Sequence, residues 1–262
     1  TTQPRTAATT DVGRRRSAVQ LREIGCGSTS SEPGGHVVAT TSVPRVRFVR
    51  VRQAGTERSF ALLDPQTRAR YVHLVARSAE AIETQLSPAV LANRVAASGL
   101  DPPELRLRPW RLERRLFAAR LADLVSRRGA IAFADVGSVF VVAAWGRALR
   151  LAGIGTAHDI EDLLTALERA GVRGLPVGPD ASAVLANAVL APVDRALREA
   201  GIDHLRWVDD VVLSGPDPEA AVSTLRGALG RIDLRLNERK TRIVLDPASL
   251  RTGSPVSAWG RR

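Results

Sequence analysis

Three aspartates in this sequence adjoin short apolar runs, and their carboxylates could hold divalent cations. Asp135 ends the run Ile131-Ala132-Phe133-Ala134, and the doublet Asp209-Asp210 lies between Leu205-Arg206-Trp207-Val208 and Val211-Val212-Leu213. Hard cations such as Mg²⁺ bind carboxylate oxygens. Two such ions neutralise the charge that is concentrated when a nucleotidyl phosphate is transferred. The pattern therefore suggests a two-metal nucleotidyl-transfer site for Mg²⁺ or Mn²⁺, although an acidic doublet alone is also typical of a solvated turn.

The periodicity of apolar residues predicts the elements that carry these aspartates. A buried strand over 131–134 ends at Asp135, and a hairpin over 205–213 carries the acidic doublet at its tip. One helix is predicted to begin at Asp180 or Ser182, either of which can cap it, and to end near Gly201. A second helix is predicted over 216–229, and a last strand over about 242–245.

These elements follow one another in the order βαββαβ, which is a split ferredoxin-like arrangement. Right-handed crossovers make the first and third strands antiparallel neighbours in the sheet. The end of the first strand then lies beside the start of the third. We therefore expect Asp135 to meet Asp209 and Asp210 at one edge of the sheet.

Five segments of the chain resemble, in order, the motifs of reverse transcriptases. Four resemble palm motifs, the third being usually Tyr-x-Asp-Asp, and the one furthest upstream resembles the fingers segment that grips the triphosphate. The segments are Arg52-Gln53-Ala54-Gly55-Thr56-Glu57-Arg58, Asp135-Val136-Gly137-Ser138-Val139-Phe140, Gly174-Leu175-Pro176-Val177-Gly178-Pro179-Asp180-Ala181-Ser182, Trp207-Val208-Asp209-Asp210 and Leu236-Asn237-Glu238-Arg239-Lys240-Thr241. The resemblance extends from about Arg45 to Leu245.

The resemblance implies an α+β, palm-and-fingers polymerase fold that acts as an RNA-directed DNA polymerase. The ferredoxin-like palm is expected over 129–250, and a fingers-like region, mostly helical with a basic hairpin, over 44–128. A disordered or extended arm is expected over 1–43 and a C-terminal tail over 251–262. Only 22 residues (262 minus 240) follow Lys240, so the thumb is expected to be absent or truncated. A partner protein would then supply the grip, or the chain is a truncated enzyme, or it does not extend primers processively.

The resemblance also assigns roles to individual residues. Asp135, Asp209 and Asp210 would be catalytic metal ligands, and Lys240 a proton donor to the leaving pyrophosphate. The residues implied to bind the nucleotide are Arg52, Arg58, Val136, Phe140, Pro176, Val177 and Gly178, and those implied to contact nucleic acid are Arg94 and Trp207. The alternatives remain open: Lys240 as a solvated lysine, Phe140 as a core residue rather than a steric gate against ribose, and the arginines as surface charges.

Two departures from the family pattern affect the expected site. Val177 replaces a polar residue beside the nucleotide, and Trp207 replaces the tyrosine before the acidic doublet. The form of the second palm motif resembles bacterial enzymes of the abortive-infection and "unknown group" type, several of which defend against phage.

Composition favours a polyanionic partner. The net charge is +11, and Lys240 is the only lysine among 38 basic residues, so we expect an RNA template or DNA primer together with deoxynucleoside triphosphates. Arginines surround a predicted amphipathic helix whose apolar side includes Leu112, Leu116 and Leu124; they form either a solvated face or a contact for a nucleic-acid backbone. One cysteine fits a reducing cytoplasm, and no apolar run predicts a membrane span.

Two other functions fit parts of the pattern. A catalytically silent relative could bind RNA or a protein through the same basic groove. A diguanylate cyclase has a related palm, but it predicts a Gly-Gly-Asp-Glu-Phe-like hairpin, and the doublet here lacks flanking glycines.

Overall fold

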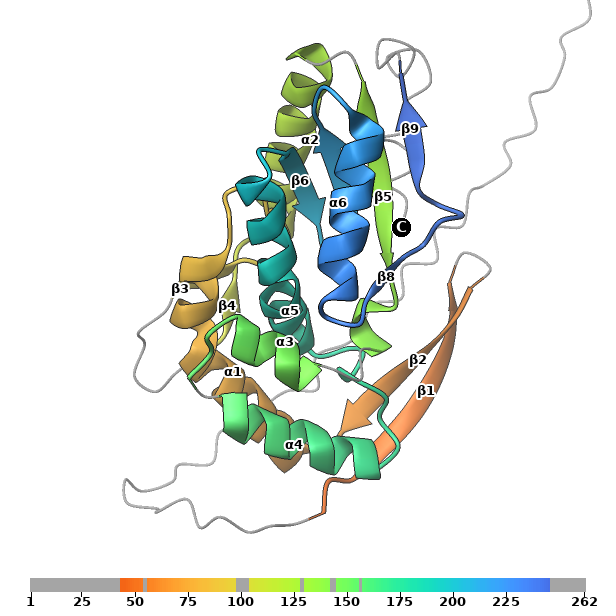
Figure 1. The fold of residues 1–262 in the computed structure, drawn as a ribbon. Helices are drawn as coiled ribbons and strands as arrows, with labels where there is room; N and C mark the ends of the chain where they lie inside the picture. The colour runs from red at the N-terminus through yellow and green to blue at the C-terminus, as the bar shows by residue number, and fades with distance from the viewer. Residues whose placement is uncertain are drawn as a thin grey trace, which may run out of the picture. The chain divides into compact units, whose positions relative to one another are not determined.

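The structure is a computed structural model that describes residues 43–53, 56–97, 104–127, 130–141, 145–155 and 157–245 (Figure 1). The predicted arm, apart from Val43, and the predicted C-terminal tail lie outside the described residues. The described residues belong to one compact unit. None of the helices in this part of the chain is both long and apolar enough to cross a membrane.

A five-stranded antiparallel sheet organises the C-terminal half. Its strands lie in the order β6-β7-β5-β8, and β9 pairs with β5 beside β8. The strands are β5 (Ile131–Gly137), β6 (Asp203–Trp207), β7 (Asp210–Ser214), β8 (Arg235–Leu236) and β9 (Arg242–Val244). Helix α5 (Asp180–Glu199) precedes the β6–β7 hairpin, and α6 (Pro218–Gly230) follows it. The antiparallel pairing predicted for the first and third strands, β5 and β7, is confirmed.

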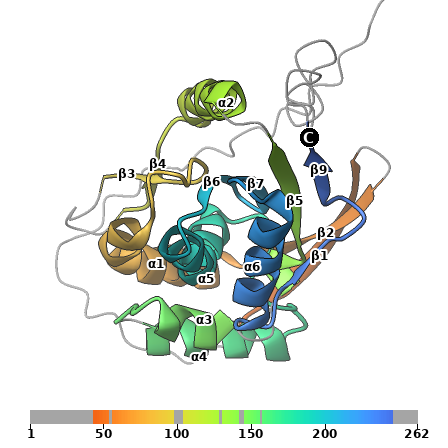
Figure 2. The same ribbon diagram turned by 45° about the horizontal axis from the view of Figure 1, so that its top comes forward.

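Helices cover both faces of this sheet (Figure 2). Alternate residues of a strand point to opposite faces. Ala132 and Ala134 of β5 pack into the large core with α5 and α6. Ile131 and Phe133 pack into a second core on the other face, under Phe117 of α2 (Trp110–Arg127).

The N-terminal half contributes a hairpin and a long helix to the same unit. Strands β1 (Val46–Gln53) and β2 (Thr56–Leu63) form the hairpin. Helix α1 (Pro65–Gln85) begins after Asp64, because the Asp64 carboxylate accepts a hydrogen bond from the Thr67 amide at 3.0 Å and Pro65 suits the first turn. Short strands β3 (Val95–Ala97) and β4 (Arg106–Leu107) connect α1 to α2.

Three helical segments between β5 and α5 were not predicted. They are the 3₁₀ turn η1 (Val139–Val141), α3 (Trp145–Leu151) and α4 (Ala157–Arg169). The large core draws side chains from α1, α3, α4 and α5, so regions predicted as fingers and palm share one hydrophobic interior.

Two local predictions were wrong. Neither Asp180 nor Ser182 caps α5: Pro179 holds the cap position without a side-chain bond, and the Ser182 hydroxyl donates to the Pro176 carbonyl. Helix α6 begins at Pro218 rather than 216, because Asp217 caps it.

The apolar side predicted for the helix now seen as α2 was wrong in part: Leu124 packs against the second core, but the other two leucines do not lie on the buried side. Leu112 is 61% exposed and Leu116 is 41% exposed, whereas Phe117 and Leu121 are buried. The docked face is the one that meets β5 and β6, and it also buries Glu113. Leucines lie on both sides of this helix, so spacing alone could not identify the buried one.

Candidate active site

Asp135 and Asp210 face each other across two neighbouring strands. The β5–β7 ladder pairs Phe133 with Val212 and Asp135 with Asp210. Residues paired in this way have Cβ atoms about 4.5–5.5 Å apart and side chains on one face. Because Phe133 and Val212 belong to the core under α2, both carboxylates lie on that face of the sheet.

Asp209 lies in the two-residue turn that joins β6 to β7. Trp207 pairs with Asp210 across the turn, and the Val136 amide donates a hydrogen bond of 2.8 Å to the Asp209 carbonyl. The backbone of Asp209 is therefore bound to β5 directly after Asp135.

The residue before Asp209 has an unusual backbone conformation. Val208 has φ +57°, in the left-handed region that a β-branched residue rarely adopts. Such a conformation costs about 1–3 kcal/mol and persists only where surrounding contacts impose it. Strain of this kind is concentrated at functional sites, so the turn is a candidate functional feature.

Lys240 and Asn237 hold the carboxylate of Asp135. They lie in the connection between β8 and β9. Neither of these strands pairs with β5 at Asp135, so the connection passes that residue. The Lys240 ammonium donates to Asp135 Oδ2 at 2.9 Å, and the Asn237 side-chain amide donates to Oδ1 at 3.0 Å. The Asn237 backbone amide also donates to the Asp135 carbonyl at 2.8 Å. The predicted catalytic lysine and the first predicted aspartate are thus direct partners.

The donor chemistry of the three aspartates suits a hard divalent cation, because carboxylate oxygens are the ligands that Mg²⁺ prefers. Within the described ranges, no three His, Cys, Asp or Glu side chains form a group able to hold a metal ion. Asp135 is instead neutralised by Lys240. The carboxylates are suitable ligands for a metal ion, and the pairing of Asp135 with Asp210 brings two of them together. A metal ion bound at Asp135 would replace its ion pair with Lys240.

Trp207 forms an aromatic surface beside the carboxylates. It packs edge-on against Phe117 of α2, with ring centroids 5.5 Å apart and an interplanar angle of 64°. The Arg114 guanidinium lies 5.1 Å from the centre of the Trp207 ring, a cation–π contact. One terminal nitrogen of Arg114 is buried with no hydrogen-bond partner among the described residues. A cationic hydrogen-bond donor, Arg114, therefore lies beside the Trp207 ring.

The loop over residues 174–179 begins against the end of η1. The Leu175 amide donates a hydrogen bond of 2.8 Å to the Phe140 carbonyl. Gly174 has φ +72°, and a Cβ added to it would lie 2.2 Å from that same carbonyl oxygen. Only glycine fits this approach, which brings the loop to Phe140. The Phe140 side chain is half-buried and packs against the large core.

The same loop is also bound to β2 and α1. The Ala61 amide donates to the Val177 carbonyl at 3.0 Å, and a Cβ on Gly178 would meet the Phe60 ring at 3.5 Å. The Ser182 hydroxyl donates to the Pro176 carbonyl at 2.6 Å and contacts the Tyr71 hydroxyl at 2.9 Å. These contacts gather Phe140, Pro176, Val177 and Gly178 at one place; their binding of a nucleotide stays a prediction.

The other residues predicted to bind the nucleotide are placed differently. Val136 is buried in the large core, so its side chain points away from the carboxylates and only its backbone borders the site. Arg52 is exposed on β1 and pairs in register with Glu57. Arg58 lies on β2.

The Arg94 guanidinium forms hydrogen bonds inside the protein. It donates to the Glu83 carboxylate at 2.8 Å and to the carbonyls of Ser87 and Val90. The side chain is nearly buried, so its bonds fix the loop after α1 rather than present a free cation to a template.

Three side chains near the predicted site were not identified from the sequence: Asn237, Arg206 and Asp194. Asn237 lies in the fourth palm motif, three residues before Lys240, so a local signal existed. The others act through partners distant in sequence, and no spacing rule would have found them. Arg114 is one of the arginines around the predicted amphipathic helix, for which a solvated face and a nucleic-acid contact were both left open.

No protein-family model matches the sequence, and no curated protein is significantly similar to it. The structure is similar to telomerase from Candida albicans solved with a fragment of telomeric RNA, with a TM-score of 0.51 and 10% identity over 77% of this chain and 42% of that one. The RNA-dependent RNA polymerase of a human picobirnavirus, as an insertion-loop deletion mutant, gives a TM-score of 0.36 and 13% identity over 77% of this chain and 46% of that one. This chain spans less than half the length of either. It has a polymerase-like fold.

Proposed function

We propose that this chain is an RNA-directed DNA polymerase that adds deoxynucleotides to a 3′ end or to a protein primer. The observation that carries the proposal is the register of β5 and β7, which sets Asp135 opposite Asp210 beside the turn that contains Asp209. The polymerase-like fold and the five ordered motifs support it, because telomerase is itself a reverse transcriptase.

In this proposal the three aspartates hold two Mg²⁺ ions, which supply charge neutralisation and alignment of the reacting oxygens when bound. The 3′-hydroxyl oxygen of the primer forms a bond to the α-phosphorus of the nucleotide, its proton passes to solvent, and the bond from that phosphorus to pyrophosphate breaks. The Lys240 ammonium donates a proton to the leaving pyrophosphate and regains one from solvent. Its ion pair with Asp135 keeps the ammonium at the site.

The surrounding residues bind the substrates. Phe140 and the loop with Val177 border the deoxyribose, and Arg52 and Arg58 grip the triphosphate. Trp207 contacts the primer end, and the Arg114 guanidinium lies 5.1 Å from the centre of its ring. The proposal also includes an RNA template, a DNA primer and a partner protein that completes the grip on the duplex.

A role in phage defence also belongs to the proposal. It rests on the second palm motif alone. The test is the plating efficiency of phage on cells that express the chain with and without its acidic doublet.

The second candidate function is a catalytically silent protein that binds RNA or a partner. The observation that favours it is that the Lys240 ammonium and the Asn237 amide both donate to Asp135, which satisfies the carboxylate without a metal ion. Such a protein would keep its affinity for RNA when the carboxylates are replaced.

The deciding experiment measures incorporation of labelled deoxynucleotides by the purified chain with Mg²⁺, with and without a primed RNA template. Asp209→Asn plus Asp210→Asn should abolish the signal. Asp233→Asn is the matched control, because Asp233 is an exposed turn residue with φ +58° that asparagine also adopts. Equal incorporation by the double variant and the control would overturn the proposed activity. RNA binding without incorporation in every protein would instead support the second candidate.

A further inference from the structure

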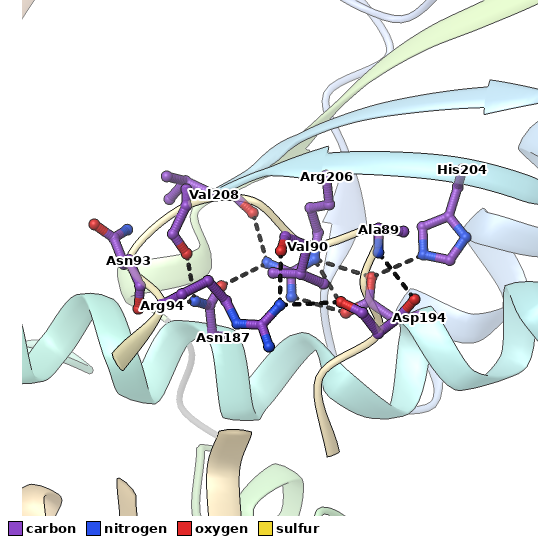
Figure 3. Close-up of polar contacts among 11 residues, drawn as sticks. Ala89, Val90, Asn93, Arg94, Asn187, Asp194, His204, Arg206 and Val208 are labelled. Atoms are coloured by element: carbon purple, nitrogen blue, oxygen red, sulfur yellow. Dashed lines mark hydrogen bonds and ion pairs between the residues drawn. The ribbon is translucent and has the colours of Figure 1, made fainter. Parts of the chain in front are cut away.

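A buried arginine connects the acidic hairpin to helix α5 (Figure 3). Arg206 of β6 is 1% exposed. Its Nε and Nη2 donate to both oxygens of the Asp194 carboxylate, at 2.7–3.1 Å. Its Nη1 donates to the Asn187 side-chain oxygen at 2.9 Å and to the Val208 carbonyl at 3.0 Å. One guanidinium thus joins two turns of α5 to the turn of the hairpin.

The charges of this cluster are balanced inside the protein. Asp194 is buried, and His204 Nε2 lies 3.4 Å from its Oδ1. Burial alone would raise the pKa of Asp194, but the Arg206 guanidinium and His204 outweigh it and hold that pKa below its ordinary value. The carboxylate therefore stays ionised, and α5 presents a fixed anion to Arg206.

The same residues also fix the loop that follows α1. The Arg206 amide donates to the Ala89 carbonyl at 2.9 Å, and the Leu91 amide donates to the Arg206 carbonyl at 3.1 Å. The Asn187 side-chain amide donates to the Ala92 carbonyl at 2.7 Å. Residues 89–92 therefore pair with β6 on the side away from β7, and β6 is held along both edges near its end.

The atom that Arg206 grips is the carbonyl of Val208, the residue with φ +57° immediately before Asp209. A turn in an unfavourable conformation needs an external restraint. Of the last two residues of β6, Trp207 points to the face of Asp135 and Asp210, and Arg206 points to α5. The guanidinium therefore acts on the turn from the opposite face of the sheet.

We propose that Arg206 is a positioning residue for the acidic hairpin. Through its bond to the Val208 carbonyl it fixes the turn so that Asp209 and Asp210 lie against Asp135. Asp194 and Asn187 hold the guanidinium in place. The inference rests on the proposed function for its effect on catalysis, whereas its effect on the hairpin itself is independent of any reaction.

The test compares Arg206→Lys with the wild type, because lysine keeps the charge but lacks the fork that spans Asp194 and Val208. Arg226→Lys is the matched control, since Arg226 of α6 forms an exposed ion pair with Glu238. The first readout is amide hydrogen exchange in the metal-free protein. Exchange in the segment 203–214 should become about tenfold faster in Arg206→Lys, with 218–230 unchanged.

The second readout is Mn²⁺ binding followed by electron paramagnetic resonance, and the third is nucleotide incorporation. Arg206→Lys should weaken Mn²⁺ binding, raise the half-saturating Mg²⁺ concentration and lower kcat by about 100-fold, because small displacements of reacting groups are costly. The KM for the nucleotide should stay unchanged. Where Arg206→Lys does not fold, Asn187→Leu replaces it, since that variant keeps the Arg206–Asp194 ion pair and removes one support of Nη1.

A lower thermal stability with unchanged exchange in 203–214 and unchanged Mn²⁺ binding would overturn the proposal, because Arg206 would then be purely structural. Faster exchange in all segments alike would overturn it as well. If the wild type incorporates no nucleotide, the proposed polymerase fails, and the exchange and Mn²⁺ measurements still decide whether Arg206 positions the hairpin.

Discussion

Replacement of Gly174 by alanine should destabilise the protein far more than replacement of a glycine that has open space around it. Gly174 has φ +72°, which costs alanine about 1–2 kcal/mol. The added Cβ would lie 2.2 Å from the Phe140 carbonyl oxygen, and the resulting displacement costs about 1–3 kcal/mol. The displacement also breaks the Leu175–Phe140 hydrogen bond, worth about 1 kcal/mol. A loss of roughly 3–6 kcal/mol follows.

Urea unfolding followed by circular dichroism measures this loss, with Gly201→Ala as the matched control. Gly201 has a similar φ of +68° but nothing within 4 Å of an added Cβ, so its variant should lose only about 1–2 kcal/mol. The difference between the variants isolates the contact with Phe140. Equal losses in the two variants would refute the reasoning, because the left-handed conformation would then account for the whole effect.

Three further predictions concern single side chains. Lys240→Arg keeps a cation but cannot release a proton near neutral pH, so single-turnover incorporation should fall by about 100-fold; a rate equal to that of Arg239→Lys would contradict the proton donor. Phe140→Ala should raise the kcat/KM for ribonucleotides relative to deoxynucleotides by about tenfold, and an unchanged ratio would exclude a steric gate. Burial raises the pKa of Glu113 from 4.5 to about 7, so the folded chain holds this proton more tightly than the unfolded chain. The resulting stability is complete below pH 4.5 and is lost as pH rises through about 7. The Tm of Glu113→Gln should therefore fall less over this pH range than the Tm of the wild type. An equally steep fall in the variant would show that another group causes it.

The elements around the aspartates could be predicted because their signals are local. The apolar runs of β5, β6 and β7 end at charged or glycine residues, and the residues of α5 repeat at helical spacing. The handedness of crossovers then determined which strands are neighbours. Helix α4 carries the same kind of signal in Ile160, Leu163, Leu164 and Leu167, so the sequence contains enough information to predict this helix as well.

Features that depend on contacts distant in sequence could not be predicted. The buried side of α2 depends on which leucines meet the sheet, and leucines are present on both sides. The Arg206–Asp194 pair joins residues of a strand and a helix that no spacing rule connects. Arg94 could not be recognised as an internal residue, because its partner Glu83 lies in a different element. The roles assigned to Arg52, Arg58 and the three aspartates stay predictions.

The interruption between β8 and β9 has a consequence for self-association. An unbroken outer strand offers a row of free amides and carbonyls to which another polypeptide can add, and proteins avoid this with short, charged outer strands. Here the outer position beside β5 is shared by two strands of two and three residues, and each begins with an arginine, Arg235 or Arg242. The break that brings Lys240 to Asp135 therefore also protects this side of the sheet from intermolecular strand addition and aggregation.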